Sequence, residues 1–187
     1  MADTLQQLLR ERADRDTVAV KYGERTWTYR EYIAEAKAQA AALIAAADPD
    51  RPLHVGVLLG NTPDMLTALA AAALGGYVVC GINTTRRGDA LARDVVMVDC
   101  QFLITDAEHH PLLDGLELPG VTVLDTSTAE WADLLAGAPE LVPHREAGVE
   151  DTFMMIFTSG TSGDPKAVQV ANMMPLFAGN ALADKFE

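Results

Sequence analysis

A chain of 187 residues that is 49% apolar and 22% charged has the composition of a globular domain, which excludes an intrinsically disordered chain. Its 27 acidic residues outnumber its 14 basic ones, so the surface as a whole disfavours nucleic acid and anionic membranes, and we expect no nucleic-acid partner. An anionic substrate would need a local site built from backbone dipoles and a lysine.

Cys80 and Cys100 are the two cysteines of the chain, and neither belongs to a CxxC pattern or lies beside paired histidines. They are typical of buried free thiols in a reducing compartment, and a disulfide or a zinc site is the weaker alternative. Residues 1–16 lack the apolar core of a secretory signal. We therefore expect a cytoplasmic protein.

The amino-terminal part of the chain predicts a hairpin followed by a long helix. Short β-forming runs at 17–21 and 25–28 flank a glycine turn. Thr28 and Glu31 then form the S/T-x-x-E pattern of a capping box, in which each residue satisfies a free N–H group at a helix start. Alanine-rich, helix-forming sequence continues to Ala47.

Residues 53–135 alternate between apolar runs of strand length and helical segments. The apolar runs lack polar alternation, which favours strands that are covered on both faces. We expect an α/β fold, a layered and mostly parallel sheet with flanking helices and right-handed crossovers. The expected strands are 53–59, 77–82, 101–105 and 121–124, and the expected helices are 61–74, 89–98 and 129–135.

Residues 65–85 carry no charge and have the length of a membrane span. Gly75 and Gly76 interrupt the run, and β-forming residues follow them. We therefore expect a buried helix, a tight turn and a buried strand, and no transmembrane segment.

The end of the chain predicts an irregular loop at 137–148, another buried strand at 152–158 and a short strand at 167–170. A helix is expected to start after Pro175. The chain ends inside this helix without a C-cap or a polar tail, so we expect a truncated chain.

Hydroxyl and glycine residues are concentrated at 158–166, in the sequence TSGTSGDPK. The preceding strand would place this loop at the carboxyl end of the sheet, where open α/β sheets bind ligands. Glycines let the backbone approach an anion, hydroxyls add donors without bulk, and the lysine adds a point charge, a combination that favours polyphosphate. The spacing excludes a Walker A loop, a GxGxxG turn and a GxSxG elbow, which leaves a solvated Ser/Gly turn as the alternative. The candidate binding residues are Thr158, Ser159, Gly160, Thr161, Ser162, Gly163 and Lys166.

The string at 158–166 resembles the phosphate-binding signature of the adenylate-forming (ANL) superfamily of AMP-dependent synthetases and ligases. Ser162 replaces the usual threonine and keeps its hydroxyl. Segments 25–43 and 54–91 resemble the opening strand and helix and the first βαβ units of the family, so the resemblance covers nearly the whole chain. Fatty acyl-CoA synthetases are the most similar subfamily. The chain departs from the family at 171–172, where Ala-Asn replaces the Ser-His of many members.

The resemblance implies a two-step ligase that converts a carboxylic acid, here a fatty acid, to an acyl-adenylate with ATP and then to a thioester with coenzyme A. In such enzymes the loop binds the β- and γ-phosphates of ATP with Mg²⁺, so we assign no catalytic residue. The resemblance also implies an incomplete amino-terminal subdomain of the large domain. Residues 1–150 would form its α/β part, and 151–187 a strand, the phosphate-binding loop and the start of a helix.

The family's adenine pocket, ribose-binding aspartate, magnesium-binding glutamate and mobile carboxyl-terminal lysine have no counterpart in this sequence. We therefore expect the isolated chain to lack activity and to self-associate through faces that truncation leaves uncovered. The alternatives are a stand-alone nucleotide- or phosphate-binding module and a protein-interaction fragment with a vestigial loop.

Other polar and aromatic residues have structural interpretations. His109-His110 is typical of a solvated loop or a helix start rather than a metal pair, because adjacent helical residues cannot both face one ion. Arg86-Arg87 is typical of a solvated face, with contact to an anion as the alternative. Trp27 and Trp131 are interpreted as packing residues.

Overall fold

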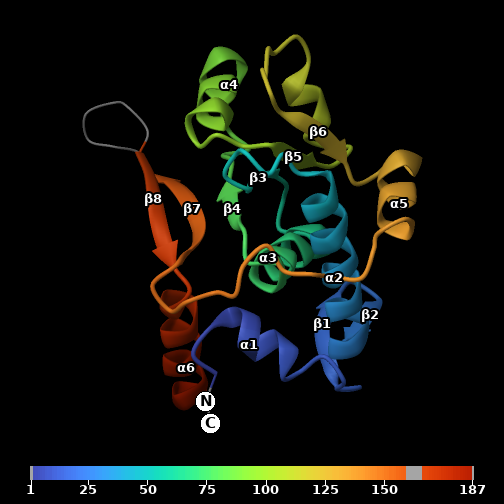
Figure 1. Cartoon of the computed structure of the whole chain (residues 1–187), viewed down its shortest axis with the longest axis vertical. Helices are drawn as coiled ribbons and strands as arrows, with labels where there is room; N and C mark the ends of the chain where they lie inside the picture. The colour runs from blue at the N-terminus through green and yellow to red at the C-terminus, as the bar shows by residue number, and fades with distance from the viewer. Residues whose placement is uncertain (1, 159–165, 187) are drawn as a thin grey trace.

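The structure is a computed structural model that describes residues 2–158 and 166–186 (Figure 1). Its main sheet has six strands: β3 (His54–Leu58), β4 (Val78–Gly81), β5 (Phe102–Thr105), β6 (Thr122–Asp125), β7 (Thr152–Thr158) and β8 (Lys166–Ala171). Their order across the sheet is β6-β5-β3-β4-β7-β8. Neighbouring strands run parallel except β7 and β8, which are antiparallel. The predicted α/β fold with a mostly parallel sheet is therefore confirmed.

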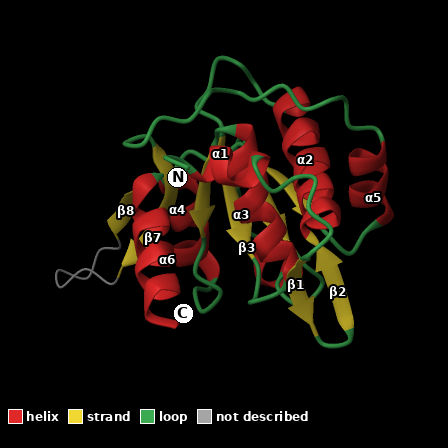
Figure 2. Ribbon diagram, turned by 90° about the horizontal axis from the view of Figure 1, so that it is seen from below, coloured by secondary structure: helices red, strands yellow, loops and turns green. Residues whose placement is uncertain are grey.

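Two clusters of buried side chains form the core on opposite faces of the sheet. Successive strand residues point to opposite faces, and Val57 of β3 belongs to the first cluster whereas Leu58 belongs to the second. The helices α2 (Tyr29–Ala46) and α3 (Pro63–Gly75) lie side by side and cover the first cluster (Figure 2). The helix α4 (Gly88–Met97) covers the second. Both faces of β3, β4 and β5 are buried, as their unbroken apolar sequences predicted.

The predicted hairpin and capping box are confirmed at the amino terminus. After α1 (Leu5–Arg10), the strands β1 (Val18–Tyr22) and β2 (Arg25–Thr28) pair antiparallel. At the start of α2, Glu31 N donates to Thr28 Oγ1 at 3.2 Å and Thr28 N donates to Glu31 Oε2 at 2.8 Å. Two of the free N–H groups at the helix start are thereby satisfied.

Residues 65–85 form a buried helix, a turn and a buried strand, as predicted. Gly76 ends α3 with φ of 69°, and its N–H donates to the carbonyl of Ala72 at 2.9 Å. Glycine adopts this left-handed conformation without steric cost, which is why the helix can stop here and β4 can begin. Within 2–158 and 166–186 no helix is long and apolar enough to cross a membrane.

The cysteines and tryptophans take the packing roles predicted for them. Cys80 and Cys100 are free and buried, and their mutual contact together with burial raises the pKa of Cys100 well above its usual value. Trp27 and Trp131 are 7% and 9% exposed. All four side chains therefore serve the core.

The irregular loop at 137–148 is fastened to the core by Gln6, a contact that the sequence did not predict. Gln6 is 2% exposed. Its Nε2 donates to the carbonyl of Arg145 at 3.1 Å, and its Oε1 accepts from Ala147 N at 3.0 Å. A buried amide therefore replaces secondary structure as the partner of this loop backbone.

The carboxyl-terminal elements differ from the prediction in two respects. The last helix begins two residues before Pro175, since proline is tolerated in the first helical turn, where its missing N–H is not needed. β7 is not fully buried, because Ile156 is 42% exposed and Thr158 is also exposed. β7 and β8 lie at an edge of the sheet, where fewer helices cover them than cover the central strands (Figure 1). The remaining elements are the short 3₁₀ helix η1 (His110–Leu113), α5 (Ala129–Ala136) and α6 (Met173–Phe186).

Candidate functional site

The glycine- and hydroxyl-rich string lies between two antiparallel strands. Thr158 ends β7, Lys166 begins β8, and these two residues are register partners. The string therefore closes a β-hairpin, and its ends are held together by the sheet. Of the seven candidate residues, Thr158 and Lys166 are described, and the other five, Ser159, Gly160, Thr161, Ser162 and Gly163, lie outside the described residues.

The parallel pairing of β7 with β4 places this hairpin end at the carboxyl edge of the sheet. The turns that follow β3, β4, β5 and β6 leave the same edge, since all of these strands run in the same direction. Ligands of open α/β sheets bind outside this edge. The expected position of the string is thus consistent with the observed topology at both of its ends.

Lys166 is exposed, and its side chain has no hydrogen-bond or ion-pair partner within the described part of the chain. Thr158 is exposed as well. Two arrangements would argue against a binding loop: burial of its ends, and pairing of the lysine with a remote carboxylate. Neither is observed within the described chain. An ammonium on a flexible stem beside a strand end can reach a phosphate oxygen.

The turn after β4 is built by its own side chains. Asn83 Oδ1 accepts from the N–H and the hydroxyl of Thr85, both at 2.8 Å. Arg87 Nη1 donates to the carbonyls of Thr84 and Arg86, both at 2.7 Å. These bonds shape the backbone that runs from β4 into α4 at the carboxyl edge.

Arg86 does not lie on the solvated face that the sequence predicted. Its Nε lies 3.2 Å from Oδ2 of Asp94, a residue of α4 whose side chain is 1% exposed. A charge this deeply buried needs an opposite charge beside it. Asp94 was not among the residues that the sequence predicted for this edge.

His109 is buried, which corrects the prediction of a solvated loop, whereas the alternative of a helix start is confirmed, since η1 begins at His110. Its Nδ1 lies 2.6 Å from Oδ1 of Asp106, directly after β5, and His110 Nδ1 lies 3.1 Å from Oδ2 of Asp125. Burial alone would raise the pKa of Asp106, but hydrogen bonds from the His109 side chain and backbone outweigh it and hold the pKa below its usual value. These pairs tie the chain segments after β5 and β6 to each other and to the sheet.

Two cavities of the described surface lie away from the hairpin end. One of about 490 Å³ lies between α2, α5 and the loop at 137–148, and its lining includes Lys37, Leu74 and Leu141. An apolar one of about 240 Å³ is lined by residues that include Leu5 and Phe153. The candidate site is defined by the sheet topology and the sequence string.

A family model described as "AMP-binding enzyme" matches residues 9–178. The match spans most of the chain and contains the whole string at 158–166. The chain therefore belongs to the family of AMP-binding enzymes, which is the adenylate-forming superfamily.

Individual relatives include acyl-CoA ligases. The chain is 40% identical over 185 residues to the medium/long-chain-fatty-acid–CoA ligase FadD17 of Mycobacterium tuberculosis. This match covers 98% of this chain and 36% of the relative. It is 34% identical over 208 residues to the steroid-22-oyl-CoA synthetase of Rhodococcus jostii. This match covers 96% of this chain and 37% of that relative. The chain thus spans little more than a third of the length of these relatives.

Solved structures of the family share the fold. O-succinylbenzoate coenzyme A synthetase (MenE) of Bacillus subtilis, in complex with AMP, has a TM-score of 0.77 at 25% identity, covering 94% of this chain and 44% of that chain. A structure described as a long-chain-fatty-acid CoA ligase from Rhodopseudomonas palustris has a TM-score of 0.80 at 22% identity, covering 97% and 48%. The six-stranded sheet and its helices match the amino-terminal part of acyl-CoA synthetases.

Proposed function

We propose that this chain is the phosphate-binding, amino-terminal part of an ATP-dependent fatty acyl-CoA ligase. The observation that carries the proposal is the position of the string at 158–166, which lies inside the family match and joins β7 to β8 at the carboxyl edge of the sheet. The fatty acid as substrate is supported by the fatty-acid–CoA ligases among the relatives. Exposed Thr158 and Lys166 support a loop that is open to a ligand.

In the proposed reaction a fatty-acid carboxylate attacks the α-phosphorus of ATP and releases pyrophosphate. The thiol of coenzyme A then attacks the acyl carbon of the acyl-adenylate and releases AMP. The loop would hold the β- and γ-phosphates with its backbone N–H groups and hydroxyls and with the ammonium of Lys166. It contributes by positioning the substrate and stabilising charge, and no loop residue attacks the substrate.

Mg²⁺ belongs to the proposal as the ion that neutralises the phosphate oxygens. Within 2–158 and 166–186 no group of three His, Cys, Asp or Glu residues could hold a metal ion. In such sites Mg²⁺ is held largely by phosphate oxygens and water and takes few protein ligands.

We further propose that the chain on its own does not complete the reaction and that it self-associates, because it spans little more than a third of the ligases it resembles. Residues 1–150 would act as the α/β subdomain, and 151–187 would supply a strand, the phosphate-binding loop and the following helix. The buried free thiols of Cys80 and Cys100 support a cytoplasmic location.

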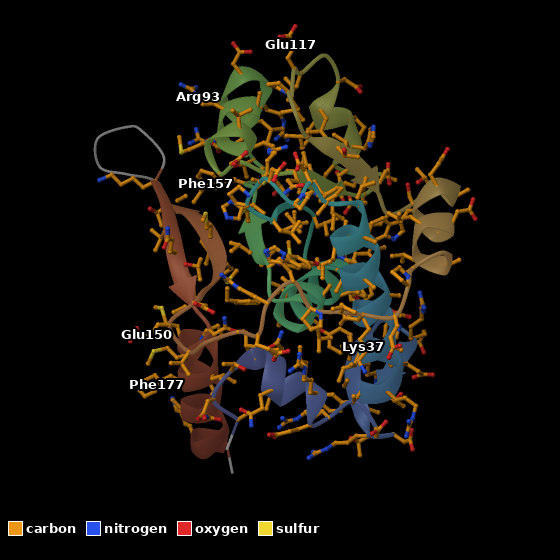
Figure 3. The ribbon with its side chains drawn as sticks, viewed as in Figure 1. Lys37, Arg93, Glu117, Glu150, Phe157 and Phe177 are labelled. Atoms are coloured by element: carbon orange, nitrogen blue, oxygen red, sulfur yellow. The ribbon has the colours of Figure 1, made fainter. Side chains whose placement is uncertain are left out.

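Isothermal titration calorimetry with ATP and Mg²⁺ tests the proposal on the 187-residue chain and on Lys166→Ala. We expect Lys166→Ala to weaken binding about tenfold or more, the size of one lost charge-assisted contact. Lys37→Ala is the matched control, because Lys37 is an exposed lysine on α2, far from the hairpin end (Figure 3). With decanoate, ATP, Mg²⁺ and coenzyme A, we expect no acyl-CoA by chromatography.

Three outcomes separate the possibilities. Lysine-dependent binding without turnover supports the proposal. Binding that is the same in the wild type and in Lys166→Ala would contradict the role of the loop, as would no binding at all, and would favour a protein-interaction fragment. An acyl-CoA product made by the purified chain would contradict the predicted lack of activity.

A further inference from the structure

The ion pair between Arg86 and Asp94 holds a cation at a fixed place. The Asp94 side chain is 1% exposed, whereas that of Arg86 is 35% exposed. Nε of Arg86 lies 3.2 Å from the carboxylate, yet neither Asp94 oxygen has an aligned hydrogen bond to a described residue. The contact is therefore electrostatic, and removing either partner would leave the other charge uncompensated. The ion pair therefore keeps the Arg86 guanidinium beside Asp94 of α4.

Arg86 keeps its hydrogen-bonding capacity for a ligand. Within the described ranges none of its side-chain N–H groups makes a hydrogen bond, although one of them faces Asp94. A guanidinium presents five donors in a planar fork that matches two oxygens of one phosphate. Arg87 differs, because its Nη1 donates hydrogen bonds to the carbonyls of its own turn.

The turn that carries Arg86 is adjacent to the hairpin end. β4 and β7 are neighbouring parallel strands, and their pairing ends with Gly81, the last residue of β4, opposite Ile156, two residues before the end of β7. Neighbouring strands lie about 4.8 Å apart. Phe157 and Ala167, the residues that adjoin the two ends of the string, pack against the same buried cluster as Leu91 and Val95 of α4. Figure 3 shows Phe157 on β7 below α4. α4 and the turn before it therefore border the candidate site.

We propose that Arg86 binds a phosphate group of an adenine nucleotide at this edge and that Asp94 is the residue that positions it. The inference rests on the proposed function and adds a second cation to Lys166. A chain with a net charge of −13 repels a polyphosphate at long range, so its site needs local cations. The phosphate belongs either to ATP or to coenzyme A, since both carry a phosphorylated adenosine.

Calorimetric titration of the 187-residue chain with ATP and Mg²⁺, and separately with coenzyme A, tests the inference. We expect Arg86→Gln to weaken the binding of one of the two nucleotides about tenfold or more. Arg86→Lys should restore part of the lost affinity. The nucleotide that responds identifies the source of the phosphate. Arg93→Gln is the matched control, because Arg93 is an arginine of α4 itself with no described ion pair or hydrogen bond.

A double-mutant comparison distinguishes a positioning role of Asp94 from a purely structural one. We expect Asp94→Asn to weaken the same nucleotide in the wild-type background but to have no further effect when Arg86→Gln is already present. Thermal unfolding of each variant, monitored by circular dichroism, confirms that the compared chains are folded. An Asp94→Asn effect of equal size in both backgrounds would show that Asp94 does not act through Arg86.

The failure of this inference differs from that of the proposed function. If the wild type binds a nucleotide in a manner that depends on Lys166 but not on Arg86, the inference is wrong and the proposed function stands. An equal loss in Arg93→Gln and Arg86→Gln would also overturn it, because net charge rather than a fixed contact would then explain the effect. If the wild type binds neither nucleotide, both are overturned.

Discussion

Gly76 shows how one residue joins two distant parts of this chain. It ends α3 at φ of 69°, and a Cβ at this position would overlap the carbonyl oxygen of Arg145 in the loop at 137–148. The neighbouring residue adds a direct bond, since His144 N donates to the carbonyl of Gly75 at 2.8 Å. The missing side chain is thus what lets the loop lie against the helix end.

Substituting this glycine should cost more than backbone strain alone. Gly76→Ala is expected to destabilise the chain by more than about 2 kcal/mol, because the left-handed conformation costs about 1–2 kcal/mol and the overlap with Arg145 adds to it. Gly23→Ala is the control, since Gly23 has φ of 57° and open space around it. Urea unfolding of the three chains measures the difference. Equal losses at both positions would show that the loop yields and that close packing is unimportant.

The charged residues of the candidate site were the least predictable ones. Asp94 sits in an amphipathic helix beside Val95, and its partner Arg86 precedes the helix, outside the i, i+3 and i, i+4 spacing that sequence patterns reveal. Likewise, His109 is buried because Asp106 follows β5 closely, a proximity that depends on where the strand ends. Exposure of a charge is decided by neighbours that the fold brings in, so the sequence predicted a solvated face for Arg86 and a solvated loop or helix start for His109.

At the scale of elements the sequence was more informative. The apolar runs of β3, β4 and β5 predicted strands that are buried on both faces, because no other environment suits so continuous a run. The same reasoning failed for β7, whose equally apolar sequence lies at a partly uncovered edge. Periodicity thus predicts what kind of element forms, whereas burial depends on which helix covers it. The string at 158–166 was recognisable because it depends on local backbone and side-chain chemistry.

The N-cap residues of two helices test how much a side-chain cap contributes to the free energy of unfolding. Thr28 caps α2 through Glu31 N, whereas Thr62, the N-cap of α3, makes no side-chain cap bond and has a buried hydroxyl without a described partner. Thr28→Val should cost about 1 kcal/mol of unfolding free energy. Thr62→Val should be neutral or stabilising, because it removes a buried polar group of the same shape. Denaturant unfolding of both variants measures the contrast, and a larger cost at Thr62 would contradict it.

The Thr28 contribution should also depend on pH. Hydrogen bonds from the backbone and side chain of Thr28 hold the pKa of Glu31 below its usual value. A carboxyl group whose pKa is lowered on folding stabilises the native state above its unfolded pKa, and this contribution is lost as the pH falls through the lower folded pKa. The difference between the wild type and Thr28→Val should therefore shrink in acid.

On the whole molecule, exposed apolar side chains gather on the carboxyl-terminal elements. β8 is the last strand of the sheet, and Lys166 is its one charged residue. The exposed apolar residues of β7, β8 and α6 are Ile156, Val168, Met173, Met174, Phe177 and Leu182. An exposed strand edge with apolar neighbours is a template for pairing with another chain. Figure 3 shows Phe177 pointing away from the body of the molecule, and its exposure is 77%.

Self-association of the 187-residue chain should therefore use this surface and should depend on salt. Burying a side chain such as Phe177 contributes about 1.5–3 kcal/mol, whereas the net charge of −13 opposes contact between copies, so screening by salt should favour the oligomer. Light scattering after size-exclusion chromatography is expected to show a larger mass at high salt and a monomer for the double variant Val168→Lys with Phe177→Lys. Val142→Lys is the control, since Val142 is 73% exposed but lies in the loop at 137–148. A monomer under all conditions, or an equal effect of the control, would show that the edge of the sheet is not the surface through which copies meet.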